Sequence, residues 1–280
     1  MPELPEVETV RKTLARVLKG KQIVKAEVLP DEIMMFGVAP TVIQAALEGR
    51  IVTDVGRHGK YWWLEFKDKP WLYGHLGMSG WVRELGAASI RLREHGKMPF
   101  DDEAGRPRFL KVLLEAEDGG RVAFTDGRRL GRLWLSSDPK TDKKLGKLGR
   151  DVYDDLPTDQ ELYATLQKRK APIKALLLDQ KLFAGIGNWI ADEVLYWGKI
   201  APKRLGSSLT LKEVRELRKA IVDVVGKAVE VGADKEQFPK NWLFHHRWEG
   251  SRGAEFIEGK PIVRETVGGR TTAWVPKVQK

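Results

Sequence analysis

The sequence predicts an α+β fold divided between two lobes, and three observations carry this prediction. A helical apolar pattern opens the chain, short runs of β type follow it to about Ser137, and helical patterns dominate the next stretch. The length of 280 residues suits two moderate domains. A hydrophobic content of 42% is enough to give each a core.

The first element is predicted to be an amphipathic helix. Apolar residues recur at helical spacing from Val7 to Leu18, and Gly20 then offers a stop. From Gln22 to about Ser137 the pattern becomes that of a β-sandwich or barrel. The β-type runs are QIVKAEVL, GRIVTDV, KYWWLEF, WLYGHL, FLKVLLEA, RVAFTD and LGRLWLS.

A polar, lysine-rich segment, SSDPKTDKKLGKLGRD, separates the β region from the helical region. We therefore expect an N-terminal domain at 1–137, a linker at 138–152 and a helical domain at 153–250. The expected helices are TDQELYATLQKRK, APIKALLLDQ, NWIADEVLYW and a long one from Leu211 to about Val231. Residues 251–280 return to alternation around a glycine pair, which is typical of a β-hairpin.

The charge balance favours a polyanionic partner. The chain has 49 Lys+Arg against 39 Asp+Glu, a formal net charge of +10, so its field attracts nucleic acid. On charge alone, a protein that is merely basic remains the alternative.

Composition also excludes several kinds of site. The chain has no cysteine, which excludes disulfides, thiol nucleophiles and Cys-based zinc sites. The histidines lack metal-ligand spacing, because His58, His75 and His95 are scattered and the remaining two are adjacent. The sequence has neither an apolar run of membrane-spanning length nor a secretion signal. We expect no metal and a soluble intracellular monomer, in the cytoplasm or nucleoid of a bacterium or the nucleus of a plant.

The run MPELPEVETVR is the most specific feature of the sequence. Removal of Met1 would leave Pro2 with a free secondary amine. An α-amino group titrates near ~8, so a useful fraction is uncharged at neutral pH and can act as a nucleophile. Glu3, beside it, can donate and accept a proton. The alternative is that Pro2 and Glu3 simply begin a helix, where such residues are common.

This run resembles the N-terminus of the formamidopyrimidine-DNA glycosylase and endonuclease VIII family, and the leucine after Glu3 favours the formamidopyrimidine branch. The resemblance implies a bifunctional DNA glycosylase and abasic-site lyase of base excision repair. Pro2 would attack the sugar C1′, and the resulting iminium would acidify the C2′ proton, so β,δ-elimination follows base loss. Glu3 would be the general acid, with Glu6 as a supporting acidic group. No diffusible cofactor is implied.

Two further stretches extend the resemblance through the β region. In RHGKYWWLEF, Lys60 lies in a glycine-flanked turn, where the resemblance implies a contact to phosphates beside the lesion. The alternative is an ordinary hairpin lysine. The loops GHLGMSG and TDGRRLGRLW resemble those that fill the gap left by a flipped nucleotide. Their candidate DNA-binding residues are His75, Met78, Arg128 and Leu130, where Leu130 replaces the phenylalanine usual in the family.

The stretch APIKALLLDQKLFAGIGNWIADEVLYWGKIAP resembles the helix-two-turn-helix of this family. Gly185 and Gly187 permit close approach of the backbone to a phosphate. Asn188 stands where it can cap the second helix. The resemblance assigns Lys174 and Asn188 to clamping the DNA backbone.

The run GGRTTAWVP resembles the C-terminal finger of the family. Most bacterial relatives hold zinc there with four cysteines, whereas this chain resembles the zincless finger of the plant-type enzymes. Arg270 is expected to grip the phosphate flanking the lesion. The side chains expected to replace the metal by packing are Phe256, Ile262, Val263 and Trp274.

The resemblance covers essentially the whole chain. It implies an N-terminal β-sandwich with an N-terminal helix, a helical C-terminal domain with a zincless β-hairpin, and double-stranded DNA between them. The expected substrates are formamidopyrimidines, further-oxidised guanines and abasic sites. We expect 8-oxoguanine to rank below them, because the loop that closes over it in the classical bacterial enzymes is not recognisable here. A non-catalytic damaged-DNA binder on the same scaffold is the main alternative, and a general nucleic-acid chaperone is another.

Overall fold

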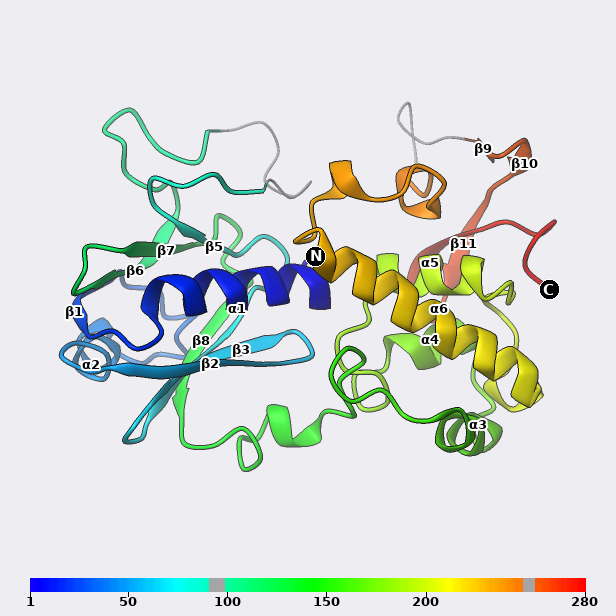
Figure 1. The fold of residues 1–280 in the computed structure, drawn as a ribbon, viewed down its shortest axis with the longest axis horizontal. Coiled ribbons are helices and arrows are strands. Elements are labelled where there is room, and N and C mark those ends of the chain that lie inside the picture. Colours follow the sequence, from blue (N-terminus) through cyan, green and yellow to red (C-terminus); the bar gives the residue numbers. More distant parts are fainter. Residues whose placement is uncertain (91–98, 249–254) are drawn as a thin grey trace. The chain divides into compact units, whose positions relative to one another are not determined.

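The computed structural model describes residues 1–90, 99–248 and 255–280, so His95 lies outside the described residues. These residues form two compact units, Met1–Lys147 and Leu148–Lys280 (Figure 1). The units divide inside the segment expected to be a linker.

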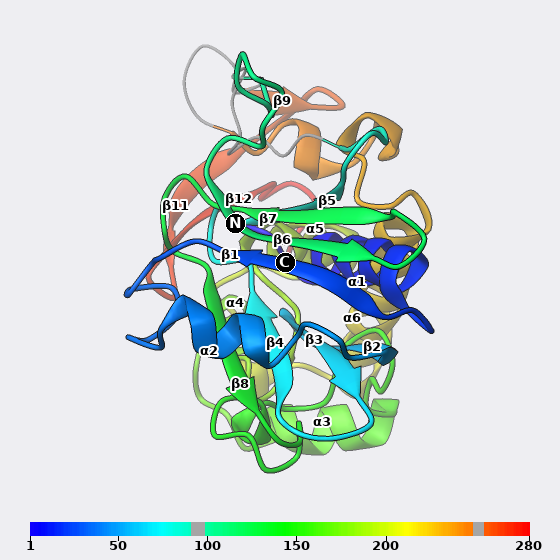
Figure 2. The same cartoon turned by 90° about the vertical axis from the view of Figure 1, so that its left-hand side faces the viewer.

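The first unit contains two four-stranded antiparallel sheets, with strand orders β1-β6-β7-β5 and β2-β3-β4-β8. The strands of the two sheets run in different directions (Figure 2). Their bounds are β1 (Ile23–Val28), β2 (Val52–His58), β3 (Tyr61–Phe66), β4 (Trp71–His75), β5 (Trp81–Glu84), β6 (Leu110–Ala116), β7 (Arg121–Thr125) and β8 (Arg132–Ser136).

Helix α1 (Leu4–Leu18) anchors the N-terminus to this unit. It contacts strands of both sheets, and its apolar face lies in the core that the sheets share. Arg57 of β2 adds a buried ion pair to Glu8 on the helix. The predicted stop is confirmed, because Gly20 takes a φ of 79° just after the helix.

The sequence patterns missed two elements of this unit, α2 (Pro40–Ala45) and β5. Both are short, and α2 buries only Ile43, so neither carries a recognisable periodicity. Beyond β8, the 3₁₀ turn η2 (Leu145–Lys147) closes the unit.

The second unit is helical and ends in a β-hairpin (Figure 1). Its helices are α3 (Asp159–Gln167), α4 (Ile173–Leu178), α5 (Asn188–Trp197) and α6 (Leu211–Glu230). Its 3₁₀ turns are η3 (Gly206–Ser208), η4 (Lys235–Gln237) and η5 (Leu243–His245). Its strands are β9 (Phe256–Ile257), β10 (Lys260–Pro261), β11 (Val263–Val267) and β12 (Arg270–Trp274). The predicted helices and hairpin are confirmed, and so is the α+β fold class.

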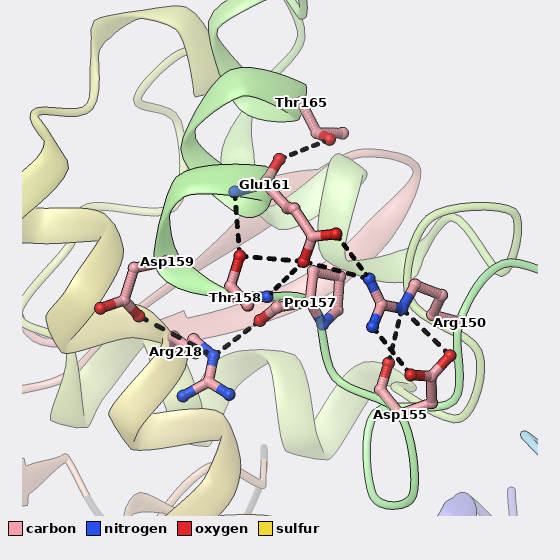
Figure 3. Close-up of polar contacts among 8 residues, drawn as sticks. All are labelled: Arg150, Asp155, Pro157, Thr158, Asp159, Glu161, Thr165 and Arg218. Carbon is pink, nitrogen blue, oxygen red and sulfur yellow. Dashed lines mark hydrogen bonds and ion pairs between the residues drawn. The ribbon is translucent and has the colours of Figure 1, made fainter.

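Polar contacts fix the start of α3 (Figure 3). Thr158 Oγ accepts a hydrogen bond from the Glu161 amide at 3.3 Å, and the Glu161 carboxylate accepts one from the Thr158 amide at 2.8 Å. Arg150 pairs with both Glu161 and Asp155. Arg218 of α6 donates to the Pro157 carbonyl at 2.6 Å, so α6 is tied to the entry of α3.

Candidate functional site

The N-terminal acidic pair lies at the first turn of α1. Pro2 is buried, Glu3 is the N-cap residue, and its amide donates to a Glu6 carboxylate oxygen at 3.0 Å. Glu3 and Glu6 form a capping box, which fixes both carboxyls beside residue 2. The structure therefore brings together the predicted nucleophile and the two predicted acids.

Glu6 can hold a proton at neutral pH. Burial raises the pKa of its carboxyl to about 7, and the neighbouring negative charge of Glu3 contributes to the rise. A carboxyl that titrates near neutrality can give or take a proton without a large energetic penalty. The pair can therefore donate a proton to, or accept one from, a group at residue 2.

Lys60 and His75 lie in the second sheet. Lys60 is buried in the turn between β2 and β3, and His75 ends β4. The His75 ring lies 4.8 Å from that of Tyr61, its partner across the strands, and its Nδ1 accepts from the Gly77 amide at 3.0 Å. Because Nδ1 is an acceptor, a neutral His75 carries its proton on Nε2.

A positive field surrounds His75. Burial, together with the charges of Lys60, Lys144 and Arg132, lowers its pKa to about 4. His75 is therefore neutral at physiological pH. The three cations around it favour an anion, and a phosphate group fits this charge pattern.

The loops GHLGMSG and TDGRRLGRLW, predicted to fill the gap left by a flipped nucleotide and called the wedge loops from here on, are in direct contact. Met78 and Leu130 expose 37% and 39% of their surface, and Arg128 is exposed as well. A Cβ atom on Gly77 would lie 2.3 Å from the Leu130 carbonyl carbon, so only glycine permits this approach. The loops thus present the three predicted side chains together at the surface.

Asp126, which sequence reasoning missed, joins these loops. Its buried carboxylate accepts from Ser79 Oγ at 2.7 Å in the first loop. It also accepts from the backbone amides of Gly131 at 2.7 Å and Arg128 at 3.1 Å in the second. The aspartate of the TDG turn was the available signal, because Asp favours such turns.

In the second unit, Asn188 does not cap α5 as expected. Gly187 is the N-cap residue, and the Asn188 side chain instead donates to the Thr271 carbonyl of β12 at 2.9 Å. The capping prediction is wrong because the amide side chain reaches across to the hairpin. Asn188 therefore ties the helix-turn-helix segment to the finger.

Lys174 is fully buried on α4. Its ammonium pairs with Asp192 of α5 and donates to the Asn188 carbonyl at 3.2 Å. The structure thus brings Lys174 and Asn188 together. Direct phosphate clamping by Lys174 stays a prediction.

Asp192 is the centre of a buried charge cluster with Lys174 and Arg247. Arg247 approaches its carboxylate to 2.6 Å, and the Ala273 amide of β12 donates to it at 3.3 Å. This cluster links α4, α5, the segment after η5 and the hairpin. Sequence reasoning missed Asp192 and Arg247, because they lie far apart in the chain.

The apolar packing expected to hold the finger together is present only in part. Ile262 is buried with Ala273 and Val275, and Trp274 is half-buried. Phe256 and Val263 are exposed, so their predicted packing role is wrong. The Asp192 cluster and the Asn188 side chain hold β12 through polar contacts instead, at Ala273 and Thr271.

Arg270 is exposed at the start of β12. Gly268 and Gly269 precede it with φ of 59° and 73°, which a two-residue hairpin turn needs. A Cβ atom on Gly268 would lie 2.8 Å from the Ala175 side chain, so the turn rests against α4. The glycine turn and its contact with α4 place Arg270 at the start of β12.

The chain lacks the donors for the zinc centre of the bacterial finger, since it contains no cysteine. Within residues 1–90, 99–248 and 255–280, no cluster of three His, Asp or Glu residues could hold a metal ion. In the same ranges, no helix combines the length and apolar character needed to cross a bilayer.

Comparisons with known proteins agree with this geometry. Residues 1–133 match the formamidopyrimidine-DNA glycosylase N-terminal domain, and residues 148–240 match the H2TH domain of the same family. The chain is 39% identical to a formamidopyrimidine-DNA glycosylase of Arabidopsis thaliana, over all of this chain and 71% of that protein. A Pelotomaculum thermopropionicum relative of the same name is 33% identical, over all of this chain and 99% of its own.

A solved structure shares the fold over its full length. The formamidopyrimidine-DNA glycosylase of Lactococcus lactis, non-covalently bound to DNA containing an AP site, aligns with a TM-score of 0.79 and 27% identity. The alignment covers 99% of both chains. From its domains and relatives, this chain belongs to the formamidopyrimidine-DNA glycosylase family.

Proposed function

We propose that the protein is a bifunctional DNA glycosylase and AP lyase that removes ring-opened or oxidised purines through an N-terminal Pro2 nucleophile. The observation that carries this proposal is the buried Glu3–Glu6 pair at residue 2, in which Glu6 titrates near neutrality. The family membership and the likeness to a structure bound to AP-site DNA support it.

The reaction begins after Met1 is removed, which converts the Pro2 nitrogen from an amide to a secondary amine. The amine attacks the sugar C1′, and the bond to the base breaks with proton donation from Glu3. Ring opening leaves an iminium between Pro2 and C1′. Loss of the C2′ proton expels the 3′ phosphate, a second elimination expels the 5′ phosphate, and water releases the sugar fragment from the enzyme.

The remaining residues bind and shape the DNA in this proposal. Lys60 and the cationic surroundings of His75 hold phosphates near the lesion. The wedge formed by Met78, Arg128 and Leu130 fills the gap left by the flipped nucleotide and offsets part of the unstacking cost. In the second unit, Lys174, Asn188 and the exposed Arg270 act at the DNA backbone, and Lys174 also donates to the Asn188 carbonyl.

Formamidopyrimidines, further-oxidised guanines and abasic sites are the proposed substrates, on double-stranded DNA. The plant-type zincless form of the family is proposed for the finger. The lack of cysteine and the Arabidopsis relative at 39% identity support this form.

Borohydride reduction during turnover tests the nucleophile. On an abasic-site duplex, the protein should be trapped covalently, and peptide mapping should place the adduct on the nitrogen of residue 2. A matched chain with one residue added before Pro2 should give no adduct, because its nitrogen is an amide. An adduct on Lys60 or another lysine would reject the proposal, and no adduct at all would favour a non-catalytic damaged-DNA binder.

Glu3→Gln should separate base release from DNA binding. Release of a ring-opened base should fall sharply while duplex binding persists, because the acid acts on charge that develops in the transition state. Equal losses of rate and affinity would reject the role of Glu3.

A further inference from the structure

Phe109 combines a strained backbone with an exposed ring, a combination that among the described aromatic residues only Phe36 shares. It lies just before β6 with a φ of 58°, in the left-handed region that bulky residues avoid. Its side chain is also 54% exposed, more than either Met78 or Leu130. Strained backbone at a residue with no compensating burial is a mark of a functional position.

The contacts of Phe109 place it at the wedge loops. Its carbonyl accepts from the Asp126 amide at 3.0 Å, which holds the strained backbone. Its ring covers Gly127, where an added Cβ would lie 3.1 to 3.3 Å from three ring atoms. Phe109 therefore lies directly beside the residue that precedes Arg128.

Asp126 makes these segments one assembly. Its carboxylate holds Ser79, next to Met78, and the turn that carries Arg128 and Leu130. Through its own amide it also holds Phe109. Three exposed apolar side chains and one arginine thus come from segments that are held by one buried residue, Asp126.

We propose that Phe109 is a fourth wedge residue, whose ring stacks on a DNA base at the gap left by the flipped nucleotide. This inference rests on the proposed function. Leu130 provides bulk at the gap but no aromatic face, and a phenyl ring next to Arg128 supplies one. Stacking on a base is tolerant of sequence, so Phe109 contributes affinity for lesion DNA more than choice of lesion.

The experiment uses a duplex with a tetrahydrofuran abasic analogue and 2-aminopurine opposite it. Phe109→Ala and Phe109→Leu should each bind about tenfold more weakly than wild type, the usual scale for loss of one stacked base. Both should also change the 2-aminopurine fluorescence of the complex. Phe109→Tyr should restore affinity and fluorescence, because it keeps the aromatic face.

Two further variants separate stacking from folding. Gly127→Ala keeps Phe109 but displaces its ring, so it should reproduce part of the Phe109→Ala effect. Val24→Ala is the matched control. Val24 is 50% exposed on β1 of the same sheet, but it lies beside the end of β6 that is distant from Phe109, where Ile23 pairs with Ala116. It should bind as wild type does.

Each outcome has a defined meaning. Wild-type affinity in Phe109→Ala or in Phe109→Leu, or an equal loss of affinity in Val24→Ala, overturns the stacking role. Borohydride trapping on single-stranded abasic DNA is measured in parallel, where no opposite base exists. Equal trapping of wild type and Phe109→Ala would show that the variant keeps its chemistry, so that a loss of duplex affinity reports on stacking. Failure of wild type to be trapped would reject the proposed function, not the stacking role.

Discussion

At the scale of single residues, the N-terminal turn holds more acid chemistry than its sequence reveals. The sequence places Pro2, Glu3 and Glu6 near one another, which any helical start would do. Only the fold shows that both carboxyls are buried together and that the pKa of Glu6 rises to about 7. Burial depends on the sheets that α1 covers, and a local pattern cannot report it.

Glu6 makes stability depend on pH. Its folded pKa of about 7 exceeds the value of 4.5 that is ordinary for a glutamate, so its contribution is fully present below pH 4.5 and is lost as pH rises through 7. The full loss is about 3 kcal/mol. Glu6→Gln, which can keep the bond from the Glu3 amide, should therefore remove this pH dependence.

Urea unfolding of wild type and Glu6→Gln at pH 5 and pH 8 measures the effect. The free energy of unfolding of wild type should fall more between pH 5 and pH 8 than that of Glu6→Gln. The control Glu84→Gln should differ less from wild type in this pH dependence, since Glu84 is partly exposed on β5. Parallel pH profiles for all three proteins would contradict the assigned burial of Glu6.

At the scale of elements, the sequence predicted those whose signals are local. The bounds of α5 coincide with the run NWIADEVLYW. Helix α6 begins directly after Thr210, its N-cap residue, which forms a capping box with Glu213 in the first turn. The contacts that hold the finger could not be predicted in the same way. Asp192 and Arg247 are 55 residues apart, and no periodicity links a helix residue to such a partner.

The Asp192 cluster should stabilise the hairpin on α5. Asp192→Asn leaves Lys174 and Arg247 buried without a counter-charge, which costs about 3–5 kcal/mol. Denaturant unfolding measures this loss, and hydrogen exchange should show faster opening of β11 and β12. Asp223→Asn breaks the exposed pair with Lys219 and should cost less than about 1 kcal/mol. Equal losses in free energy of unfolding for the two variants would mean that the cluster does not stabilise the hairpin.

At the scale of the whole molecule, the sequence predicted the order of the parts better than their interactions. An N-terminal helix, a β region, the helices α3 to α6 and a terminal hairpin follow in the expected order along the described residues. Contacts that depend on distant partners were missed: Asp126 between the wedge loops, Asn188 on the hairpin, and Phe109 over Gly127. Each of these joins segments that the sequence separates.

The net charge of +10 should make lesion binding depend strongly on salt. Affinity for an abasic-analogue duplex should fall as salt rises, and Arg270→Ala should reduce the slope of log affinity against log salt by about 1 for one lost phosphate contact. Lys219→Ala, on the exposed face of α6, should leave the slope unchanged. An altered lesion preference with an unaltered slope would contradict a phosphate contact at Arg270.

The charge cluster on Asp192 also has a chemical consequence. Cysteine thiolates that hold zinc can be oxidised step by step, and a finger built on them loses its metal under the same oxidants that damage guanine. Carboxylate, ammonium and guanidinium groups have no comparable oxidation ladder. A hairpin fixed by Asp192, Lys174 and Arg247 therefore keeps its shape during oxidative stress, when the proposed substrates of this protein are formed.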